Sequence, residues 1–279
     1  MSRFAVPVHG NYHGYYSKRP SIRDPRLALL PADFFQAKRV LDVGCNEGWV
    51  TCEIAQTWGA SQVIGVDIDD TLIRAAWKRR RTVWSLQAPS GIQSSEPSND
   101  IDLSAISEPS QKRMRMSLPS EGNISDYFPA SCEHIYGPLP IPNHVRDDHD
   151  FPHNVSFRAA DWLHDEIPED KTPYDIIIAF SISKWIHLNS GDEGLLRFFE
   201  RVHNALKLGG TFILEPQAWD TYAKARRMDD SLKENARNLK IRPNEFEIIL
   251  QKIGFGSVQH LGTTGEGGFH RPVDLYVKV

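Results

Sequence analysis

The residues best suited to chemistry in this chain are a glycine-containing loop and an acid that follows it. The loop lies in Val-Leu-Asp-Val-Gly-Cys-Asn-Glu-Gly at 40–48, where Gly44 and Gly48 let the chain turn sharply and bring its backbone close to a ligand. A second apolar run follows after a helix-length gap and ends on Asp67. An acid in that place commonly binds the two hydroxyls of an adenosine ribose. We therefore predict a nucleoside ligand here; an ordinary strand-to-helix turn without a ligand is the alternative.

The order of these residues narrows the choice of ligand. Asp42 comes before the glycines, and the spacing of Gly-Cys-Asn-Glu-Gly at 44–48 differs from the G-x-G-x-x-G of dinucleotide-binding loops. An acid inside the first strand suits a cationic cofactor without phosphate better than it suits a pyrophosphate. S-adenosylmethionine has these properties and is the predicted cofactor.

A second polar group follows the apolar run at 174–180. Lys184 and His187 lie three residues apart in Ser-Ile-Ser-Lys-Trp-Ile-His-Leu-Asn at 181–189, so they share one face if this stretch is helical. The carboxyl ends of the strands in an open α/β sheet form the edge that carries the active site. A single histidine is more often structural than catalytic, but a lysine and a histidine together at this edge favour a functional role.

Asp161 and Trp162 follow a further predicted strand, at 155–158. In this kind of sheet the loop after the third strand flanks the adenine. Asp161 would accept a hydrogen bond from the exocyclic amine, and Trp162 would stack on the ring. A helix-capping aspartate and a core tryptophan explain the same two residues equally well.

The periodicity of apolar residues predicts the elements that position these groups. We predict strands at 38–43, 62–67, 155–158, 174–180 and 211–215, and two final strands near 255–261 and 273–278. We predict helices at 26–36, 47–58, 70–84, 192–206, 219–237 and 243–253, with the glycines of 207–210 as a helix stop. Strands that alternate with helices and end in an antiparallel pair predict the seven-stranded α/β sheet of a class I S-adenosylmethionine-dependent methyltransferase.

Composition excludes several other classes of protein. The chain is 40% hydrophobic and 24% charged, which is typical of a soluble globular protein, and no apolar run is long enough to cross a membrane. The absence of an apolar signal core at the N-terminus predicts a nuclear or cytosolic location. The three cysteines match neither a disulfide framework nor a zinc site, so no metal is predicted. We expect Cys45 to face the cofactor loop.

Two segments differ in composition from the rest. Residues 85–153 are rich in Ser, Pro, Asp and Asn, which predicts a disordered insertion within a methyltransferase domain at 26–279. Residues 1–25 form an arm in which aromatic side chains alternate with cations, a combination that stacks bases and binds phosphates. Because the net charge is −4, RNA binding would depend on a local patch such as this arm, which we predict to contact both RNA and the cofactor. Removal of residues 1–20 should weaken RNA binding more than cofactor binding.

The chain also resembles the Bicoid-interacting methyltransferase family over nearly its whole length outside 85–153. The resemblance is carried by Asn-Tyr-His-Gly-Tyr-Tyr at 11–16, Leu-Asp-Val-Gly-Cys-Asn at 41–46, Val-Asp-Ile-Asp at 66–69, Ser-Lys-Trp-Ile-His-Leu-Asn at 183–189, Gly-Asp-Glu-Gly at 191–194, Leu-Glu-Pro-Gln at 214–217 and Gly-Phe-His-Arg-Pro at 268–272. It implies methyl transfer from S-adenosylmethionine to the terminal phosphate of an RNA 5′ end. In the best-described branch the acceptor is the γ-phosphate of a small nuclear RNA 5′ triphosphate, which further implies a nuclear location and ribonucleoprotein partners.

The same resemblance implies roles for individual residues. Cofactor contacts fall on Tyr16, Arg26, Gly44, Asp67, Ile68, Asp161, Trp162 and Phe180, to which we add the loop residues Cys45, Asn46 and Gly48. The predicted catalytic residues, which would hold the phosphate, are Tyr15, Arg19, Lys184 and His187. Asp161-Trp162 departs from the Asn-Tyr of the best-described branch.

Three other functions stay open from the sequence. A sister branch methylates the 5′ monophosphate of a tRNA, although Lys184 resembles the triphosphate branch. A largely non-catalytic RNA-binding protein is a second alternative. A small-molecule or protein methyltransferase is a third, and it predicts an acceptor pocket without the cations Arg19, Lys184, His187 and Arg271.

Overall fold

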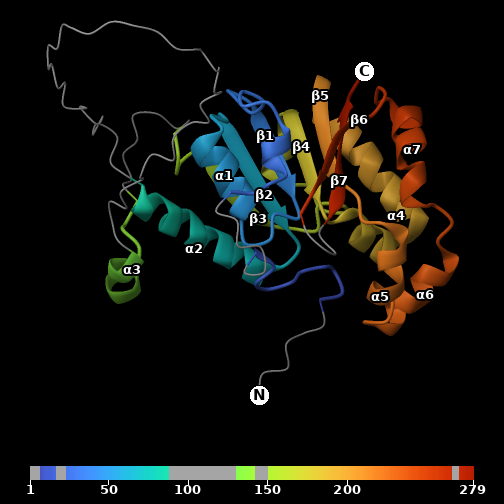
Figure 1. The fold of residues 1–279 in the computed structure, drawn as a ribbon, viewed down its shortest axis with the longest axis horizontal. Helices are drawn as coiled ribbons and strands as arrows, with labels where there is room; N and C mark the ends of the chain where they lie inside the picture. The colour runs from blue at the N-terminus through green and yellow to red at the C-terminus, as the bar shows by residue number, and fades with distance from the viewer. Residues whose placement is uncertain (1–6, 17–22, 88–129, 142–149, 266–269) are drawn as a thin grey trace, which may run out of the picture. The chain divides into compact units, whose positions relative to one another are not determined.

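A seven-stranded sheet forms the centre of the fold, in the order β3-β2-β1-β4-β5-β7-β6 (Figure 1). The computed structural model describes residues 7–16, 23–87, 130–141, 150–265 and 270–279. The strands are β1 (Arg39–Val43), β2 (Gln62–Asp67), β3 (Val155–Ala159), β4 (Tyr174–Phe180), β5 (Leu206–Glu215), β6 (Gln259–Thr264) and β7 (Arg271–Val277). Strands β1 to β5 pair in parallel, whereas β7 is antiparallel to both β5 and β6. This arrangement brings the carboxyl ends of five strands to one edge.

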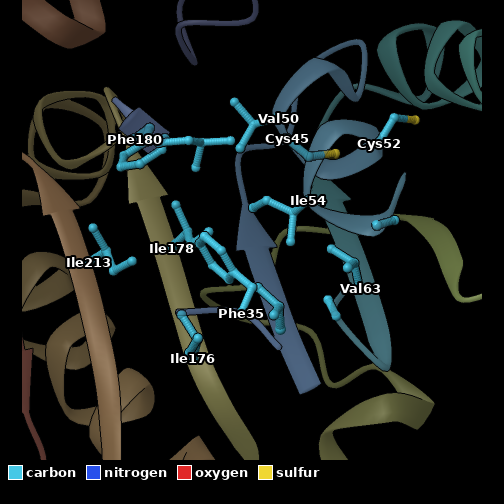
Figure 2. Close-up of a cluster of buried hydrophobic side chains, with 14 of the residues drawn as sticks. Phe35, Cys45, Val50, Cys52, Ile54, Val63, Ile176, Ile178, Phe180 and Ile213 are labelled. Carbon is cyan, nitrogen blue, oxygen red and sulfur yellow. The ribbon is translucent and has the colours of Figure 1, made fainter. Parts of the chain in front are cut away.

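Helices lie on both faces of this sheet. They are α1 (Trp49–Thr57), α2 (Asp70–Leu86), α4 (Ser183–Ala205), α5 (Tyr222–Ala225), α6 (Asp230–Asn238) and α7 (Phe246–Ile253). Two buried clusters divide the side chains of β1, β2, β4, β5 and β7, because successive residues point to opposite faces. In β4, for example, Ile176 and Ile178 pack on one face with α1, whereas Ile177 packs on the other face with α4 and α7. Figure 2 shows the first cluster, which includes Phe35, Ile54 and Phe180.

Local signals explain how the elements begin and end beside the site. Gly48 has a left-handed backbone (φ +74°), which only glycine adopts freely, and α1 starts directly after it. The carboxylate of Asp69 accepts a hydrogen bond from the backbone N–H of Thr71 at 2.8 Å and so caps the start of α2. Strand β2 ends on Asp67 and β5 ends on Glu215, which places both acids at the shared edge.

Several predicted boundaries are wrong, for identifiable reasons. The predicted helix at 26–36 is only a short 3-10 helix, Leu27–Leu29, followed by turns. The glycines at 207–210 do not stop a helix but lie within β5, where backbone groups of Gly209 and Gly210 pair with Lys278. Helix α4 begins nine residues earlier than predicted, at Ser183 instead of 192.

The remaining differences lie near the C-terminus. The predicted helix at 219–237 is divided into a 3-10 turn at Trp219–Thr221, α5 and α6. The predicted strand at 255–261 becomes β6, and Phe255 forms only an isolated bridge. The 3-10 turn and α5 carry Asp220, Thr221 and Lys224, which line the cavity at the edge of the sheet.

The chain divides into two compact units, Met1–Arg81 with Ile141–Val279, and Thr82–Pro140. In the smaller unit the structure describes the end of α2 and helix α3 (Ala130–Tyr136), and the backbone N–H of Leu139 donates to Ser85 Oγ at 2.7 Å. Most of the predicted insertion, 88–129 and 142–149, lies outside the described residues. Among the described helices, none is long and apolar enough to cross a membrane.

Candidate active site

Eleven of the fifteen predicted site residues meet in one cavity at the carboxyl ends of the parallel strands. Its volume is about 1060 Å³, and the arm at 7–16, the loop after β1 and the ends of β2, β4 and β7 contribute to its wall. The predicted residues that line it are Tyr15, Tyr16, Arg26, Gly44, Asn46, Asp67, Ile68, Asp161, Trp162, Phe180 and Lys184. Cys45, Gly48 and His187 do not reach its surface, and Arg19 lies outside the described residues.

Gly44 shapes the loop between β1 and α1. Its φ of +76° is in the left-handed region, and a Cβ at this position would lie 2.3 Å from Cγ2 of Ile182. The backbone N–H groups of Gly44 and Cys45 donate to the carbonyl of Val66 at 2.8 and 3.0 Å, which ties the loop to β2. The loop therefore presents bare backbone to the cavity, as the sequence predicts.

Cys45 and Gly48 support this loop from behind. The thiol of Cys45, which we expected to face the cofactor loop, is buried in the cluster of Figure 2 and does not line the cavity, and this burial raises the pKa of the thiol. A Cβ on Gly48 would lie 2.8 Å from ring atoms of Phe157. Both residues thus permit close packing of α1 against the sheet.

Asp67 and Ile68 form the part of the cavity at the end of β2. The Asp67 carboxylate is 8% exposed and accepts hydrogen bonds from the backbone N–H groups of Asn46 at 2.9 Å and Asp69 at 3.0 Å. Burial raises its pKa, although these two hydrogen bonds oppose the shift. A carboxylate has about four lone-pair positions, so it retains acceptor capacity for two ligand hydroxyls. Ile68, 41% exposed, offers an apolar surface beside it.

Arg26 is 1% exposed and has protein partners for all its nitrogens. It donates to both carboxylate oxygens of Asp24, at 2.8 and 2.6 Å, and to Glu215 at 2.9 Å. It also donates to the hydroxyl of Tyr16 at 3.3 Å, and its guanidinium lies 4.3 Å from the centre of the Phe180 ring. Arg26 therefore fixes Tyr16 and Phe180, both of which line the cavity.

Asn46 has a buried polar atom that suits a ligand. Its side-chain N–H₂ donates to the carbonyl of Tyr12 at 3.2 Å, whereas its Oδ1 has no hydrogen-bond partner among the residues described. Buried polar atoms are rarely left without a partner. Together with the Asp67 carboxylate and the glycine loop, this oxygen fits a ligand that carries hydroxyl and ammonium donors, as S-adenosylmethionine does.

Asp161 and Trp162 line the cavity but also have clear structural partners. Asp161 accepts a hydrogen bond from the backbone N–H of Leu163 at 3.1 Å and lies 2.8 Å from Nδ1 of His164. Trp162 is 2% exposed, and its indole N–H donates to Asp170. These contacts match the capping and core roles that were the alternative to adenine binding.

Cations gather at the other end of the cavity, around Lys184. This side chain is 8% exposed, its Nζ lies 3.4 Å from Oγ1 of Thr221, and it forms no ion pair within the described part of the chain. Burial lowers the pKa of its ammonium to about 8, Arg271 and Lys224 act in the same direction, and Asp220 opposes them. A buried ammonium beside other cations is a natural site for an anion.

Ser181 connects this end to the N-terminal arm and to β7. Its φ of +62° is unusual for a residue other than glycine. Its hydroxyl donates to Glu215, accepts from Nη1 of Arg271 at 2.6 Å and lies 3.2 Å from the hydroxyl of Tyr15. Gln217, 1% exposed, holds the Ser181 carbonyl and accepts a hydrogen bond from the backbone at the start of α4. Sequence reasoning missed Ser181 and Gln217, and the available signal was their position just after β4 and β5.

His187 does not have the geometry of a phosphate ligand. It is fully buried, its Nδ1 lies 3.2 Å from the hydroxyl of Tyr222, and its Nε2 lies 2.7 Å from Oδ1 of Asp192. Burial lowers its pKa. Asp192 lies beyond Gly191, whose φ of +70° and ψ of −172° interrupt α4. His187 therefore joins the two parts of a kinked helix, and its predicted contact with phosphate has no support in this arrangement.

The N-terminal arm contacts both ends of the cavity. At the cofactor end, the side chain of Asn11 donates to Asp69 at 2.8 Å. At the cationic end, Asn189 donates to the carbonyl of Val8 at 2.8 Å. Within the described ranges no group of His, Cys, Asp or Glu side chains has the arrangement of a metal site.

The fold and the cavity together define a class of protein. The sheet order, the glycine loop after β1, the acid at the end of β2 and the cavity at the strand ends are those of a class I S-adenosylmethionine-dependent methyltransferase. A methyltransferase-domain profile matches residues 40–104. The magnesium protoporphyrin IX methyltransferase of Synechocystis, solved with S-adenosylmethionine bound, superposes with a TM-score of 0.51 at 11% identity over 98% of this chain and 88% of that one, a likeness of fold alone.

Sequence comparison identifies the particular family. A profile of the Bicoid-interacting protein 3 (Bin3) family matches residues 174–278. The chain is 36% identical to the mouse 7SK snRNA methylphosphate capping enzyme over 97% of its own length and 40% of that protein. It is 32% identical to a probable RNA methyltransferase of Arabidopsis thaliana, over 96% of its own length and 79% of that protein. The chain belongs to the Bin3 family.

These findings confirm the predicted family, the class I fold and S-adenosylmethionine as the cofactor of the class. The chain spans about two fifths of the length of the mouse and human capping enzymes, 40% and 39% respectively. Similarity alone therefore does not assign the activities and substrates of these longer proteins to this chain.

Proposed function

We propose that this protein transfers a methyl group from S-adenosylmethionine to a phosphate at the 5′ end of an RNA, with the γ-phosphate of a small nuclear RNA 5′ triphosphate as the preferred acceptor. The observation that carries the proposal is Lys184, a buried ammonium without an ion pair in the described chain, facing the same cavity as the glycine loop and Asp67. The names of the relatives, which include a capping enzyme for a small nuclear RNA, agree with it. A small nuclear RNA acceptor would place the activity in the nucleus.

The cofactor would lie at the end of the cavity formed by β1 and β2. Asp67 would accept hydrogen bonds from its ribose hydroxyls, Ile68 would cover its base, and Asn46 would accept a donor through its free Oδ1. Gly44 would allow the backbone to approach it closely. The cofactor supplies an electrophilic methyl group, and all other chemistry belongs to the residues around the acceptor.

The acceptor phosphate would lie at the cationic end, against Lys184, Arg271 and the hydroxyl of Tyr15. A phosphate oxygen is already ionised at neutral pH, so no general base is required, in contrast to a hydroxyl acceptor. The main task of these residues is therefore to position the oxygen about 3 Å from the methyl carbon and in line with the sulfur. They would do so by charge-assisted hydrogen bonds to the oxygens that do not react.

The direct test is a methyl-transfer assay with radiolabelled S-adenosylmethionine and one short RNA that carries a 5′ hydroxyl, monophosphate or triphosphate. We expect the label in the triphosphate RNA first, less in the monophosphate RNA, and none in the hydroxyl RNA, which serves as the matched control. A higher rate with the monophosphate would assign the chain to the monophosphate branch. Equal labelling of all three, or labelling of a small molecule instead of RNA, would refute the proposal.

A non-catalytic RNA-binding role makes a different prediction in the same assay. It requires stable binding of the phosphorylated RNA without transfer of label. The intact glycine loop and the Asp67 carboxylate favour turnover, because neither is needed to bind RNA.

A further inference from the structure

The turn from Ser181 to Lys184 contacts both ends of the cavity. Ile182 packs so closely against the glycine loop that a Cβ on Gly44 would collide with its Cγ2. At the other end, the hydroxyl of Ser181 accepts a hydrogen bond from Arg271, and the side chain of Lys184 lines the cavity. The conformation of this one turn therefore sets the distance between the cofactor loop and the cations around the acceptor.

The turn does not have a conformation that its own residues favour. Ser181 has a φ of +62°, and a residue other than glycine is strained in this left-handed region. Helix α4 starts two residues later without a local cap, because Ile182 at its N-cap position has no side-chain acceptor. A strained backbone and an uncapped helix start both require support from elsewhere in the structure.

Gln217, which follows the end of β5, gives this support through a single carboxamide. Its Nε2 donates to the carbonyl of Ser181, and its Oε1 accepts hydrogen bonds from the backbone N–H of Lys184 and the hydroxyl of Ser183, both at 3.1 Å. The side chain is 1% exposed, so water does not compete for these groups. One buried amide thus holds both ends of the turn and replaces the missing cap of α4.

Glu215 contacts the same turn, but its contacts are divided between the two ends of the cavity. It accepts a hydrogen bond from the hydroxyl of Ser181 and also pairs with Arg26 at the cofactor end. The three hydrogen bonds of the Gln217 side chain, in contrast, all go to the turn. Gln217 is therefore the residue whose substitution tests the turn without breaking the ion pairs of Arg26.

We propose that Gln217 is a positioning residue for methyl transfer, which holds the turn at 181–184 in its strained conformation and so keeps the acceptor phosphate in line with the methyl group. The inference rests on the proposed function, because it concerns transfer between the two ends of this cavity. The rate of such a transfer depends steeply on alignment, and a displacement of about 1 Å can cost on the order of 100-fold. Loss of the carboxamide should therefore lower the rate of transfer more than it lowers cofactor affinity.

The experiment measures kcat with saturating S-adenosylmethionine and the 5′-phosphorylated RNA that the wild-type protein methylates fastest, and cofactor affinity by calorimetry. Gln217→Met keeps the length of the side chain but removes all three hydrogen bonds. Its kcat should fall about tenfold or more, whereas its cofactor affinity should stay within about threefold of wild type. Gln251→Met, at an exposed position on α7, is the matched control and should change neither quantity. An unchanged kcat for Gln217→Met, or an equal loss of cofactor affinity, would overturn the proposal.

Ser181→Gly distinguishes positioning from packing. Glycine adopts a positive φ without strain, so the turn needs less support once Ser181 is replaced. Gln217→Met should therefore cost less in kcat in the Ser181→Gly background than in the wild type. An equal cost in both backgrounds would show that Gln217 acts through packing alone, which contradicts the proposal.

Gln217→Glu decides the question if Gln217→Met fails to fold. A carboxylate still accepts hydrogen bonds from the N–H of Lys184 and the hydroxyl of Ser183, but it cannot donate to the carbonyl of Ser181. We expect a loss of kcat that Ser181→Gly again reduces, and an undiminished kcat would refute the inference. If the wild-type protein labels no RNA, the proposed function itself fails; if it labels RNA and the Gln217 variants match it, only this inference fails.

Discussion

Lys184 is the residue on which the acceptor site depends most directly. Lys184→Met keeps the length of the side chain but removes its charge, so methylation of a 5′-phosphorylated RNA should fall about tenfold or more. A charge-assisted hydrogen bond of this kind contributes about 1.5–3 kcal/mol. Calorimetry should show that S-adenosylmethionine affinity is retained. The same substitution at Lys233, which is exposed on α6 and outside the cavity, is the control and should change neither quantity.

The same ammonium predicts how RNA binding depends on pH. Because burial and the neighbouring cations lower its pKa to about 8, Lys184 is charged below that pH and loses its charge above it. RNA affinity should therefore fall as the pH rises beyond about 8, and bound phosphate should move the midpoint upward by favouring the charged form. Lys184→Arg keeps its charge, so its filter-binding profile should be flat. A flat wild-type profile would contradict the assignment.

His187 should affect stability, in contrast to Lys184. Replacing it by alanine leaves Tyr222 and Asp192 without a shared partner and opens a small cavity, so the free energy of unfolding should fall by about 2–4 kcal/mol. Urea denaturation measures this loss, with Lys184→Met as the comparison. If His187→Ala instead left stability intact and abolished RNA binding, the original prediction of a phosphate ligand would be restored.

The contrast between these two residues shows what can be predicted at this scale. Lys184 and Asp67 line the same cavity, and their predicted positions at strand ends explain why, since the ends of parallel strands share one edge. Helical spacing indicates that Lys184 and His187 share a face, but it does not indicate how deeply each side chain is buried. Lys184 lines the cavity, whereas His187, three residues further along, lies in the core. Ser181 and Gln217 were missed because their partners lie more than thirty residues away, at 34 and 36 positions.

At the scale of elements, the glycine loop can be tested by substituting Gly44, with the same substitution at Gly191 as the control. Gly44→Ala would place a Cβ 2.3 Å from Ile182, so the loop must shift, and S-adenosylmethionine affinity should fall about tenfold or more. Gly191→Ala has a similar left-handed φ, +70°, but an added Cβ meets no atom within 4 Å. Because its ψ of −172° lies in a region that essentially only glycine adopts, the variant should lose about 1–3 kcal/mol of stability to backbone strain, seen as a lower melting temperature, and keep its cofactor affinity. Equal loss of affinity in both variants would show that strain alone is responsible.

The elements that were predicted well are those with continuous apolar runs. Strands β2 and β4 have the predicted bounds, and β1 begins one residue later than predicted, because buried parallel strands leave a clear pattern in the sequence. Glycines were harder to interpret. Lys207-Leu-Gly-Gly was expected to end a helix, yet long-range pairing with Lys278 extends β5 through it. Gly191 interrupts α4 without ending it, so the segment before it was not recognised as helical.

At the scale of the whole molecule, the arm joins the two ends of the cavity. The sequence predicts an arm that contacts both RNA and the cofactor. In the structure Asn11 donates to Asp69 beside the cofactor end, and Asn189 donates to the carbonyl of Val8 at the cationic end. Deleting residues 1–16 should therefore reduce both S-adenosylmethionine and RNA affinity, by about tenfold each, in calorimetry and filter binding. A deletion of residues 1–6 retains these contacts and is the matched control. Loss of RNA binding alone would indicate that the arm contributes to RNA binding and not to cofactor binding.

The opposite charges at the two ends of one cavity have a consequence for turnover. Asp42 and Asp67 line the end where the donor would lie, and Lys184, Lys224 and Arg271 line the end where the acceptor would lie. Moving a methyl group from sulfonium to phosphate would neutralise one positive charge at the first end and one negative charge at the second. Each product would then be held less firmly than the substrate from which it came. The methyl transfer itself would therefore favour release of both products, and no separate conformational change would be needed for their release.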